Sequence, residues 1–521
     1  MKLTGQGIGL QFHLRSPLFH RVTKVQVCSS WAALETPNAE KRLNQEATSP
    51  VKVHNTVANG KSREWRKVNG SDLGISSKLI SLPTRKVLNG LKQKGYDVYL
   101  VGGCVRDIIL KRTPKDFDII TTADLREIKR VFSWCEIVGK RFPICHVHIG
   151  GTIIEVSSFK TIGRNSHYTC DDNGALDCDA KDYSRWKNCL RRDFTINGLM
   201  YDPFEKIVYD YLGGLEDLKK AKVRTVIPAS KSFQEDSARI LRAIRIAARL
   251  GFKLSKLTAR SAAELSTSVL KLDKGRIMLE MNYMLSYGAA EPSFRALWKF
   301  GLLEILLPIQ AEYFVRSGFK RREKKSNMLL SLLKNMDKLL APDRPCHSCL
   351  WFGLLAFHKA LEERPRHHLG VAAFCLAMHN GGDIKEAVKI AQRIDTPPDS
   401  SFNELSDCGH VDIKMLLKEI KDLYKCLNRA LNEMISESCV AAAMSKYPQA
   451  PFSNLVFLPI TLYVKTSKLF ECVKYGSGDA EKYCPSHGRK IDYEQLNFGS
   501  LYEIRRIFAR IVFDTIYPSI S

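Results

Sequence analysis

The sequence predicts an α+β protein, in which a small mixed β-sheet is followed by an all-α remainder. Short apolar segments with strand-type alternation lie between residues 98 and 211. After Gly213-Gly214 the spacing of apolar residues becomes helical and stays helical. A length of 521 residues with 45% hydrophobic and 26% charged residues is typical of a globular protein with several domains.

The composition indicates which kinds of partner and which kind of compartment to expect. The formal charge of +25 suggests a polyanionic partner, with RNA or DNA the first candidate, although a basic targeting segment plus scattered lysines would give a similar excess. Because no apolar run approaches the roughly 18 residues of a membrane-spanning helix, we expect no membrane partner. The 15 cysteines show no disulfide-framework spacing, which fits a reducing compartment.

Residues 1–70 are expected to form a transit peptide and a disordered linker. Residues 1–34 contain no Asp or Glu but carry two arginines, two lysines and several serines, which is typical of organelle leaders. Residues 35–70 are polar and mixed in charge. The sequence therefore predicts a chloroplast or mitochondrial location, without separating the two. The alternative is a disordered extension of a cytoplasmic or nuclear protein.

The stretch VYLVGGCVRDIILKRTPKDFD, residues 98–118, predicts a phosphate-binding turn. A buried strand ends at Gly102-Gly103, where no Cβ blocks close approach of a phosphate to the backbone. A helix starting near Val105 would point its free N–H groups at that anion. Most Gly-Gly turns are only turns, so the prediction depends on the residues beyond this helix.

Two carboxylates come directly after this helix. In a strand, the two-residue period would place Asp116 and Asp118 on one face and Phe117 on the other. Paired carboxylates on a rigid strand suit two Mg²⁺ ions that bridge nucleotide phosphates. Glu155, on the next predicted strand, is either a third ligand or an ordinary surface residue. The turn and the carboxylates together predict a nucleotidyl-transfer site.

Residues 160–188 are rich in Asp, Asn, Gly and Ser and are expected to form a mobile loop beside the site. The loop closes at the sequence RRDFTING. Arg191 and Arg192 offer planar donor forks suited to a triphosphate, while Asp193 and Asn197 could hold ribose hydroxyls. A charged helix start is the alternative interpretation.

The segment EDSARILRAIRIAARL, residues 235–250, predicts a basic amphipathic helix. Asp236 and Arg239 stand three residues apart, so they would be neighbours on its surface and present acceptor and donors to the edge of a base. Spacing alone favours an ordinary helix ion pair. Arg242 and Arg245 continue a basic face that could contact triphosphate or RNA.

Three further features are weaker signals. The basic run RSGFKRREKK, residues 316–325, is either a phosphate-tracking patch or a solvated linker. Cys346 and Cys349 form a lone CxxC without a second pair at zinc spacing, so we expect a structural role. His146 and His148 share one face of a predicted strand, but no third metal ligand is nearby.

Four motifs follow one another in a fixed order: Gly102-Gly103 with Arg106 and Asp107, Asp116-Phe117-Asp118, Arg191-Arg192-Asp193 with Asn197, and Glu235-Asp236-Ser237-Ala238-Arg239. This order resembles the class II tRNA nucleotidyltransferase and bacterial-type poly(A) polymerase family, within the DNA polymerase beta-like superfamily. The resemblance covers roughly residues 98 to 308 and is nearest to the poly(A) polymerase branch of plant organellar type.

The resemblance implies an architecture of head, neck, body and tail. Its expected parts are a transit peptide and linker (residues 1–70), a nucleotidyltransferase head (71–222), a helical neck with the base-selecting motif (223–310), and a helical, RNA-binding body and tail (311–521).

The resemblance also implies the chemistry. Two Mg²⁺ ions at Asp116 and Asp118, with Glu155 as the candidate third ligand, would serve transfer of a nucleotide from ATP to an RNA 3′ end. Asp236 and Arg239 would select the incoming base. The other nucleotide-binding positions are Gly102, Gly103, Arg106, Asp107, Arg191, Arg192, Asp193, Asn197, Arg242 and Arg245.

Two reactions of the family remain in competition. The segment IVGKRFPICHVHI, residues 137–149, resembles the stretch that marks bacterial poly(A) polymerases, with Lys140 in place of an Arg. We therefore favour addition of AMP to mRNA or other transcripts over CCA addition to tRNA. An inactive RNA-binding homologue is disfavoured, because binding alone needs no paired metal carboxylates. The oligomeric state is not predicted.

Overall fold

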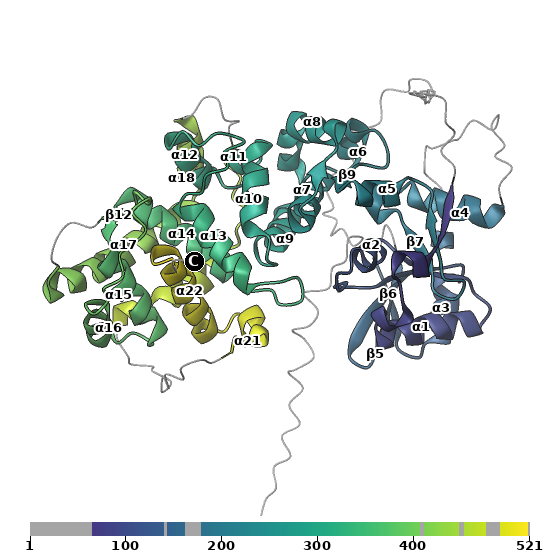
Figure 1. Ribbon diagram of the computed structural model, residues 1–521, viewed down its shortest axis with the longest axis horizontal. Coiled ribbons are helices and arrows are strands. Elements are labelled where there is room, and N and C mark those ends of the chain that lie inside the picture. The colour runs from purple at the N-terminus through teal and green to yellow at the C-terminus, as the bar shows by residue number, and fades with distance from the viewer. Residues whose placement is uncertain are drawn as a thin grey trace, which may run out of the picture.

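The computed structural model describes residues 65–139, 143–161, 179–406, 411–446, 453–475 and 490–518. The predicted leader, most of its linker, and Lys140 lie outside these residues. In Figure 1 the strands gather at one end of the molecule and most helices from α13 (Met328–Leu339) onward form the other end. Helices α7 (Ala238–Leu250) and α9 (Lys274–Leu285) lie between them.

The head contains one eight-stranded mixed sheet in the order β1-β8-β7-β2-β3-β6-β5-β4. Neighbouring strands are antiparallel, except that β3 and β6 are parallel. The predicted mixed sheet is therefore confirmed. The strands are β1 (Arg66–Asn69), β2 (Val98–Val101), β3 (Asp118–Thr121), β4 (Cys135–Val138), β5 (Ile144–Ile149), β6 (Thr152–Ser158), β7 (Met200–Asp202) and β8 (Ile207–Asp210).

Helices support this sheet through apolar faces. In α1 (Leu82–Gln93) the Ser81 hydroxyl accepts the Thr84 N–H, and the buried side chains Val87, Leu88 and Leu91 face the sheet. The predicted loop over residues 160–188 is partly helical, because α4 begins after Asp179; residues 162–178 lie outside the described chain. The other head helices are α2 (Gly103–Ile109), α3 (Leu125–Val131), α4 (Ala180–Cys189) and α5 (Gly214–Lys219).

The neck begins with an interrupted helix, whereas the sequence predicted one helix over residues 235–250. Asp236 is extended, with φ −151° and ψ 99°, and its carboxylate accepts the N–H of Ala238 at 3.0 Å. This bond satisfies the first backbone N–H of the next helix, and the extended backbone of Asp236 separates the two helices. The neck helices are α6 (Ala229–Glu235), α7 (Ala238–Leu250), α8 (Lys256–Glu264), α9 (Lys274–Leu285), α10 (Ala290–Lys299), α11 (Leu303–Leu306) and α12 (Pro308–Arg316).

The body is a bundle of helices around aromatic residues such as Trp351, Phe374 and Phe508, all fully buried. None of the described helices is long and apolar enough to cross a membrane. The body helices are α13 (Met328–Leu339), α14 (Cys349–Glu363), α15 (His368–His379), α16 (Ile384–Ala391), α17 (Ile413–Ile435), α18 (Glu437–Ser445), α19 (Ile460–Phe470), α20 (Cys472–Tyr475), α21 (Tyr493–Phe498) and α22 (Leu501–Ile516).

The helical part is not purely α. Strand β9 (Lys222–Val223) pairs with β10 (Lys253–Leu254), and β11 (Arg366–His367) pairs with β12 (Leu405–Ser406), both in parallel. The expected head–neck boundary at residue 222 falls inside β9. Two-residue strands are too short to give an alternation pattern, which is why the sequence did not reveal them.

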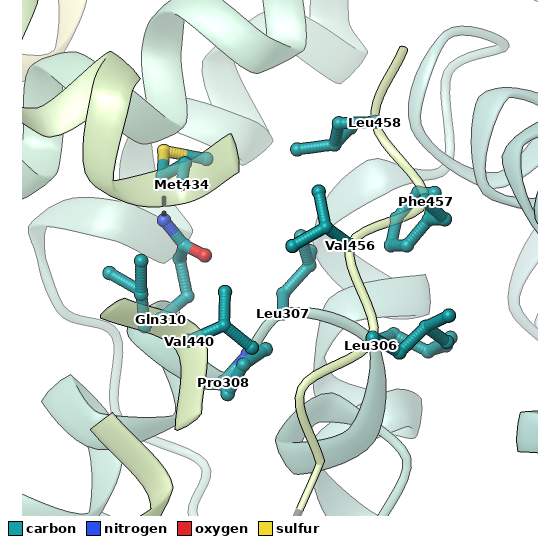
Figure 2. Close-up of a pocket in the computed structure, with 11 residues that line it drawn as sticks. Leu306, Leu307, Pro308, Gln310, Met434, Val440, Val456, Phe457 and Leu458 are labelled. Atoms are coloured by element: carbon teal, nitrogen blue, oxygen red, sulfur yellow. Dashed lines mark hydrogen bonds between the residues drawn. The ribbon is translucent and has the colours of Figure 1, made fainter. Parts of the chain in front are cut away.

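The neck and body meet at a small apolar cavity (Figure 2). Leu306 and Leu307 line it from the α11 side, and Val456 and Phe457 from a segment far along the chain. The Gln310 amide donates to the Met434 sulfur at 3.5 Å. A volume of about 10 Å³ holds one water at most, so the cavity is packing space between two parts of the fold.

Candidate nucleotidyl-transfer site

The turn after β2 is shaped for close approach of a ligand. Gly102 has φ +78°, a conformation that L side chains rarely adopt, and α2 starts directly after it, two residues earlier than expected. A Cβ at Gly102 would lie 3.3 Å from Asp118 Oδ2 and 3.5 Å from Arg192 Nη1. Three predicted site residues therefore meet at this turn.

The two aspartates differ in environment, contrary to the prediction that one strand holds both. Strand β3 starts at Asp118, and Asp116 lies before it with its side chain 67% exposed. Burial raises the pKa of Asp118 to about 6, Arg192 opposes this shift, and the charge of Asp116 adds to it. The two carboxylates are close enough to repel each other.

Glu155 lies beside Asp118 in the sheet. The two residues are partners in the parallel register of β3 and β6, so their side chains point to the same face. On the other side of Glu155, the His146 ring lies 3.9 Å from its carboxylate, and burial lowers the pKa of that histidine. His148 instead stacks on Trp134 with ring centroids 4.6 Å apart.

The described residues contain no group of three or more His, Cys, Asp or Glu side chains gathered for a metal ion. The set Asp116, Asp118 and Glu155 therefore remains a prediction. Its chemistry fits a hard cation, because all donors are carboxylate oxygens and because a cation would favour the ionised form that burial of Asp118 disfavours.

A buried polar chain backs the Gly102 turn. Arg106 donates to the Asp107 carboxylate at 2.9 Å and to the side-chain oxygen Oδ1 of Asn197 at 2.6 Å. The Asn197 amide in turn donates to Asp193 at 2.9 Å. These side chains, expected to contact triphosphate and ribose, bind one another in the structure, and so fix the turn from behind.

Arg191 and Arg192 follow α4 and do not start a helix. Arg192 lies at the front of the site beside Gly102 and interacts with Asp118. Arg191 is half-buried, and burial lowers its pKa. The position of Arg192 is compatible with an anion that enters the turn.

The polar chain continues from the head into the neck. Asp193 accepts from Arg242 of α7 at 3.2 Å. Burial by itself would raise the pKa of Asp193, but the charge of Arg242 and the hydrogen bond from Asn197 lower it. Glu280 of α9 lies 2.9 Å from Arg245 and 3.7 Å from Arg242. Sequence reasoning missed Glu280, because a single Glu in an amphipathic helix carries no signal of two distant partners.

Asp236 and Arg239, predicted to be neighbours on one helix surface, have different partners in the structure. Asp236 binds Arg276 of α9 at 2.8 Å, while Arg239 donates to the Ser232 hydroxyl at 3.0 Å and lies 3.3 Å from Glu235. The two side chains fail to meet because Asp236 lies outside the helix that contains Arg239. Arg276 is the second residue at the candidate site that sequence reasoning missed.

Lys115 joins the aspartate segment to the neck. Its ammonium lies 4.8 Å from the ring centroid of Tyr283 and 5.1 Å from that of Tyr287, and 3.9 Å from Asp116. Burial, together with Arg249 and Arg245, lowers the pKa of this lysine. The segment before β3 is thus held against α9.

Family comparisons match two parts of the chain. Residues 98–224 match the model described as the poly A polymerase head domain, and residues 251–314 match the model described as the probable RNA and SrmB-binding site of polymerase A. The poly(A) polymerase I of Salmonella typhi is 34% identical over 318 residues, which cover 59% of this chain and 67% of the relative.

A second group of relatives is similar over a shorter length. The CCA-adding enzyme of Geobacillus stearothermophilus is 34% identical over 203 residues, 38% of this chain and 48% of the relative. The crystal structure of the Bacillus stearothermophilus CCA-adding enzyme in complex with CTP covers 76% of this chain and 94% of that chain, with 21% identity and a TM-score of 0.42. The sequence similarity to the Geobacillus CCA-adding enzyme covers less of this chain than the similarity to Salmonella poly(A) polymerase I does.

The identity to Salmonella poly(A) polymerase I over two thirds of that protein, together with the ordered motifs at the Gly102 turn, decides the family. The chain is an RNA nucleotidyltransferase and belongs to the class II family of tRNA nucleotidyltransferases and bacterial poly(A) polymerases.

Proposed function

We propose that this protein adds AMP from ATP to RNA 3′ ends without a template, as a poly(A) polymerase. We favour this reaction over CCA addition because of the length of chain over which each group of relatives is similar. Likeness to poly(A) polymerase I extends over 318 residues, whereas likeness to CCA-adding enzymes at the same 34% identity extends over only 203. The likeness to poly(A) polymerase I therefore takes in 59% of this chain, against 38% for the CCA-adding enzyme.

CCA addition to tRNA is the second candidate. The observation that favours it is the equal identity to CCA-adding enzymes where they do match. The catalytic motifs at Gly102, Asp116 and Asp118 serve both reactions.

Asp116, Asp118 and Glu155 would hold Mg²⁺. When bound, two such ions would activate the RNA 3′-hydroxyl and neutralise the charge of the pyrophosphate leaving group. The chain itself supplies positioning. Strand register keeps Glu155 beside Asp118, and Lys115 holds the preceding segment against the neck.

The Gly102 turn would receive the triphosphate. The absence of a Cβ lets phosphate oxygens approach the backbone, and Arg192 at the same turn would neutralise part of their charge. Arg106, Asp107, Asp193 and Asn197 would act behind the turn, because their hydrogen-bonding groups are largely used within the protein. Direct contact of these four with the nucleotide would require them to exchange partners.

Asp236 and Arg239 would both contact the incoming base, and each is held in place by a different neighbouring side chain. Arg276 fixes the Asp236 carboxylate, and Ser232 fixes the Arg239 guanidinium. An acceptor and a donor held in this way can match the amino group and the ring nitrogen on one edge of adenine. Because both side chains are held in place, they cannot shift easily to contact a smaller base.

RNA binding by the neck and body completes the proposal. The match of residues 251–314 to a family model described as a probable RNA-binding site and the formal charge of +25 support it.

Incubation of the full chain with generic RNA, and separately with tRNA lacking its 3′ end, tests the function. We expect Mg²⁺-dependent incorporation of many AMP residues on generic RNA and little use of CTP. Incorporation of CTP into tRNA followed by a stop after three nucleotides would establish the second candidate instead. No metal-dependent incorporation from any nucleotide would contradict both.

A further inference from the structure

We propose that four cations on the segment after α12 bind the phosphate backbone of the RNA substrate. We call Lys320, Arg322, Lys324 and Lys325 the basic ridge. The inference rests on the proposed function in that RNA is the ligand, and it adds a binding surface outside the catalytic turn and beyond the residues that the family models match.

The backbone of the ridge is held from α10. The Trp298 indole donates to the carbonyl of Lys320 at 3.3 Å. The Arg295 guanidinium donates to the carbonyls of Glu323 at 2.8 Å and Lys325 at 3.0 Å. A solvated linker would have no such fixed contacts along its length.

Two residues of the segment serve as anchors. Arg321 forms an ion pair with the fully buried Glu304, donates to the Trp298 carbonyl at 2.6 Å, and lies 3.8 Å from the Trp298 ring centroid. Phe319 stacks on Phe314 with ring centroids 4.8 Å apart. Arg321 therefore attaches the segment to the rest of the fold, and Glu304 compensates its charge.

The ridge cations are different from these anchors. All four side chains are exposed, and none has an ion pair or side-chain hydrogen bond within the part of the chain that the structure describes. The one acid among them, Glu323, accepts the backbone N–H groups of Lys324 at 3.0 Å and Lys325 at 3.2 Å. Four positive charges against one carboxylate thus stand on a fixed backbone.

The anchoring residues lie in the matched RNA-binding part of the neck. Arg295, Trp298, Glu304 and Phe314 all fall within residues 251–314. The ridge is therefore attached to the part of the chain whose family description names RNA. A preorganised row of cations binds a polyanion with less loss of conformational freedom than flexible side chains on a mobile segment.

The test replaces the four ridge cations with alanine in the full chain (K320A/R322A/K324A/K325A). The matched control K78A/K86A/K94A/R126A removes three lysines and one arginine that are exposed on the head. RNA affinity is measured without nucleotide by fluorescence anisotropy across a salt series, and AMP incorporation is measured separately with saturating RNA. Thermal unfolding checks that both variants are folded.

We expect RNA affinity of the ridge variant to fall at least tenfold, and the slope of log K against log salt to become shallower by about 3, since each cation that neutralises a single-strand phosphate contributes about 0.7. The KM for ATP should change less than twofold. Arg295→Ala, which keeps all four cations but frees their backbone, should weaken binding severalfold.

Unchanged RNA affinity in a folded ridge variant would overturn the proposal, and so would equal weakening in the head control, which would assign the effect to net charge. Failure of the proposed function can be told apart from failure of this inference. In that case the wild-type chain would incorporate no nucleotide, while the binding comparison between the two variants would still give its own result.

Discussion

Asp118 is a carboxylate whose surroundings disfavour its own charge. It lies at the first residue of β3, partly buried beside Asp116, with Arg192 as the compensating cation, and its pKa is raised to about 6. Metal-free protein therefore carries an electrostatic cost at this position near neutral pH. Such a cost is typical of a site built for a cationic ligand.

Replacement of Asp118 by Asn separates this cost from catalysis. A raised carboxyl pKa means that the folded state binds more protons than the unfolded state between about pH 4 and 6, so stability falls as pH rises through that window. At pH 8 without metal, Asp118→Asn should raise the free energy of unfolding by up to about 3 kcal/mol. The gain should vanish below about pH 4.

Urea unfolding at pH 8 and pH 4 measures the effect. Asp116→Asn is the matched control, because its exposed side chain makes the same charge change without desolvation. Both variants should lose AMP incorporation at least a hundredfold. Wild-type activity in either variant would remove that carboxylate from the proposed site.

In our proposal, base selection also depends on Arg276, which does not itself contact the base. Arg276 holds Asp236 at 2.8 Å, so Arg276→Ala should free the carboxylate to rotate and accept cytosine as well as adenine. We expect the ratio of kcat/KM for ATP to that for CTP to fall roughly tenfold, about 1.4 kcal/mol.

Steady-state kinetics with each nucleotide measure this ratio. Arg276→Lys should restore part of it, since a cation remains beside the carboxylate, and Arg260→Ala on the exposed face of α8 should leave it unchanged. A ratio that stays at the wild-type value in Arg276→Ala would exclude a positioning role for this arginine.

At the scale of elements, α7 and α9 connect the catalytic head to the neck. The link is the polar chain from Arg106 and Asn197 through Asp193 to Arg242, and then to Glu280. Because these contacts run from head elements to neck helices, they fix how α7 lies relative to the Gly102 turn. Lys115 on Tyr283 adds a second tie.

Glu280→Ala should break this connection. Loss of a buried carboxylate leaves Arg242 and Arg245 near each other without their shared partner, so we expect a loss of about 3 kcal/mol in the free energy of unfolding. Glu264→Ala, an exposed acid on α8, is the control and should cost less than about 0.5 kcal/mol. Equal losses in the two variants would contradict a structural role for Glu280.

At the scale of the whole molecule, the N-terminal residues are proposed to direct import into an organelle. Full-length chain, radiolabelled by translation in vitro, should enter either isolated chloroplasts or isolated mitochondria and become shorter by processing within residues 1–70. A chain lacking residues 1–70 should remain outside. Exclusion of the full chain from both organelles would instead favour a cytoplasmic or nuclear location.

Much of the fold could be predicted from local patterns. Strand β6 alternates clearly between buried and more exposed positions, β2 is a short apolar run before a glycine turn, and helices such as α1 and α7 bury one stripe of apolar residues, so class and order followed from the sequence. The break at Asp236 did not, because a hydrogen bond from the Ala238 N–H to the Asp236 side chain competes there with a good helix pattern. Strand β9 was too short to leave a pattern.

The sequence by itself determined the family, through the order of its motifs, and predicted the site residues: the glycine turn, the carboxylates and the arginines. Only the tertiary structure decided which groups face which. It placed Glu155 in register with Asp118, gave Asp236 to Arg276 and not to Arg239, and left the basic ridge on a backbone held by Arg295. The physical reason is that residue types and spacings define local geometry, whereas pairing across elements depends on how helices and strands distant in sequence pack.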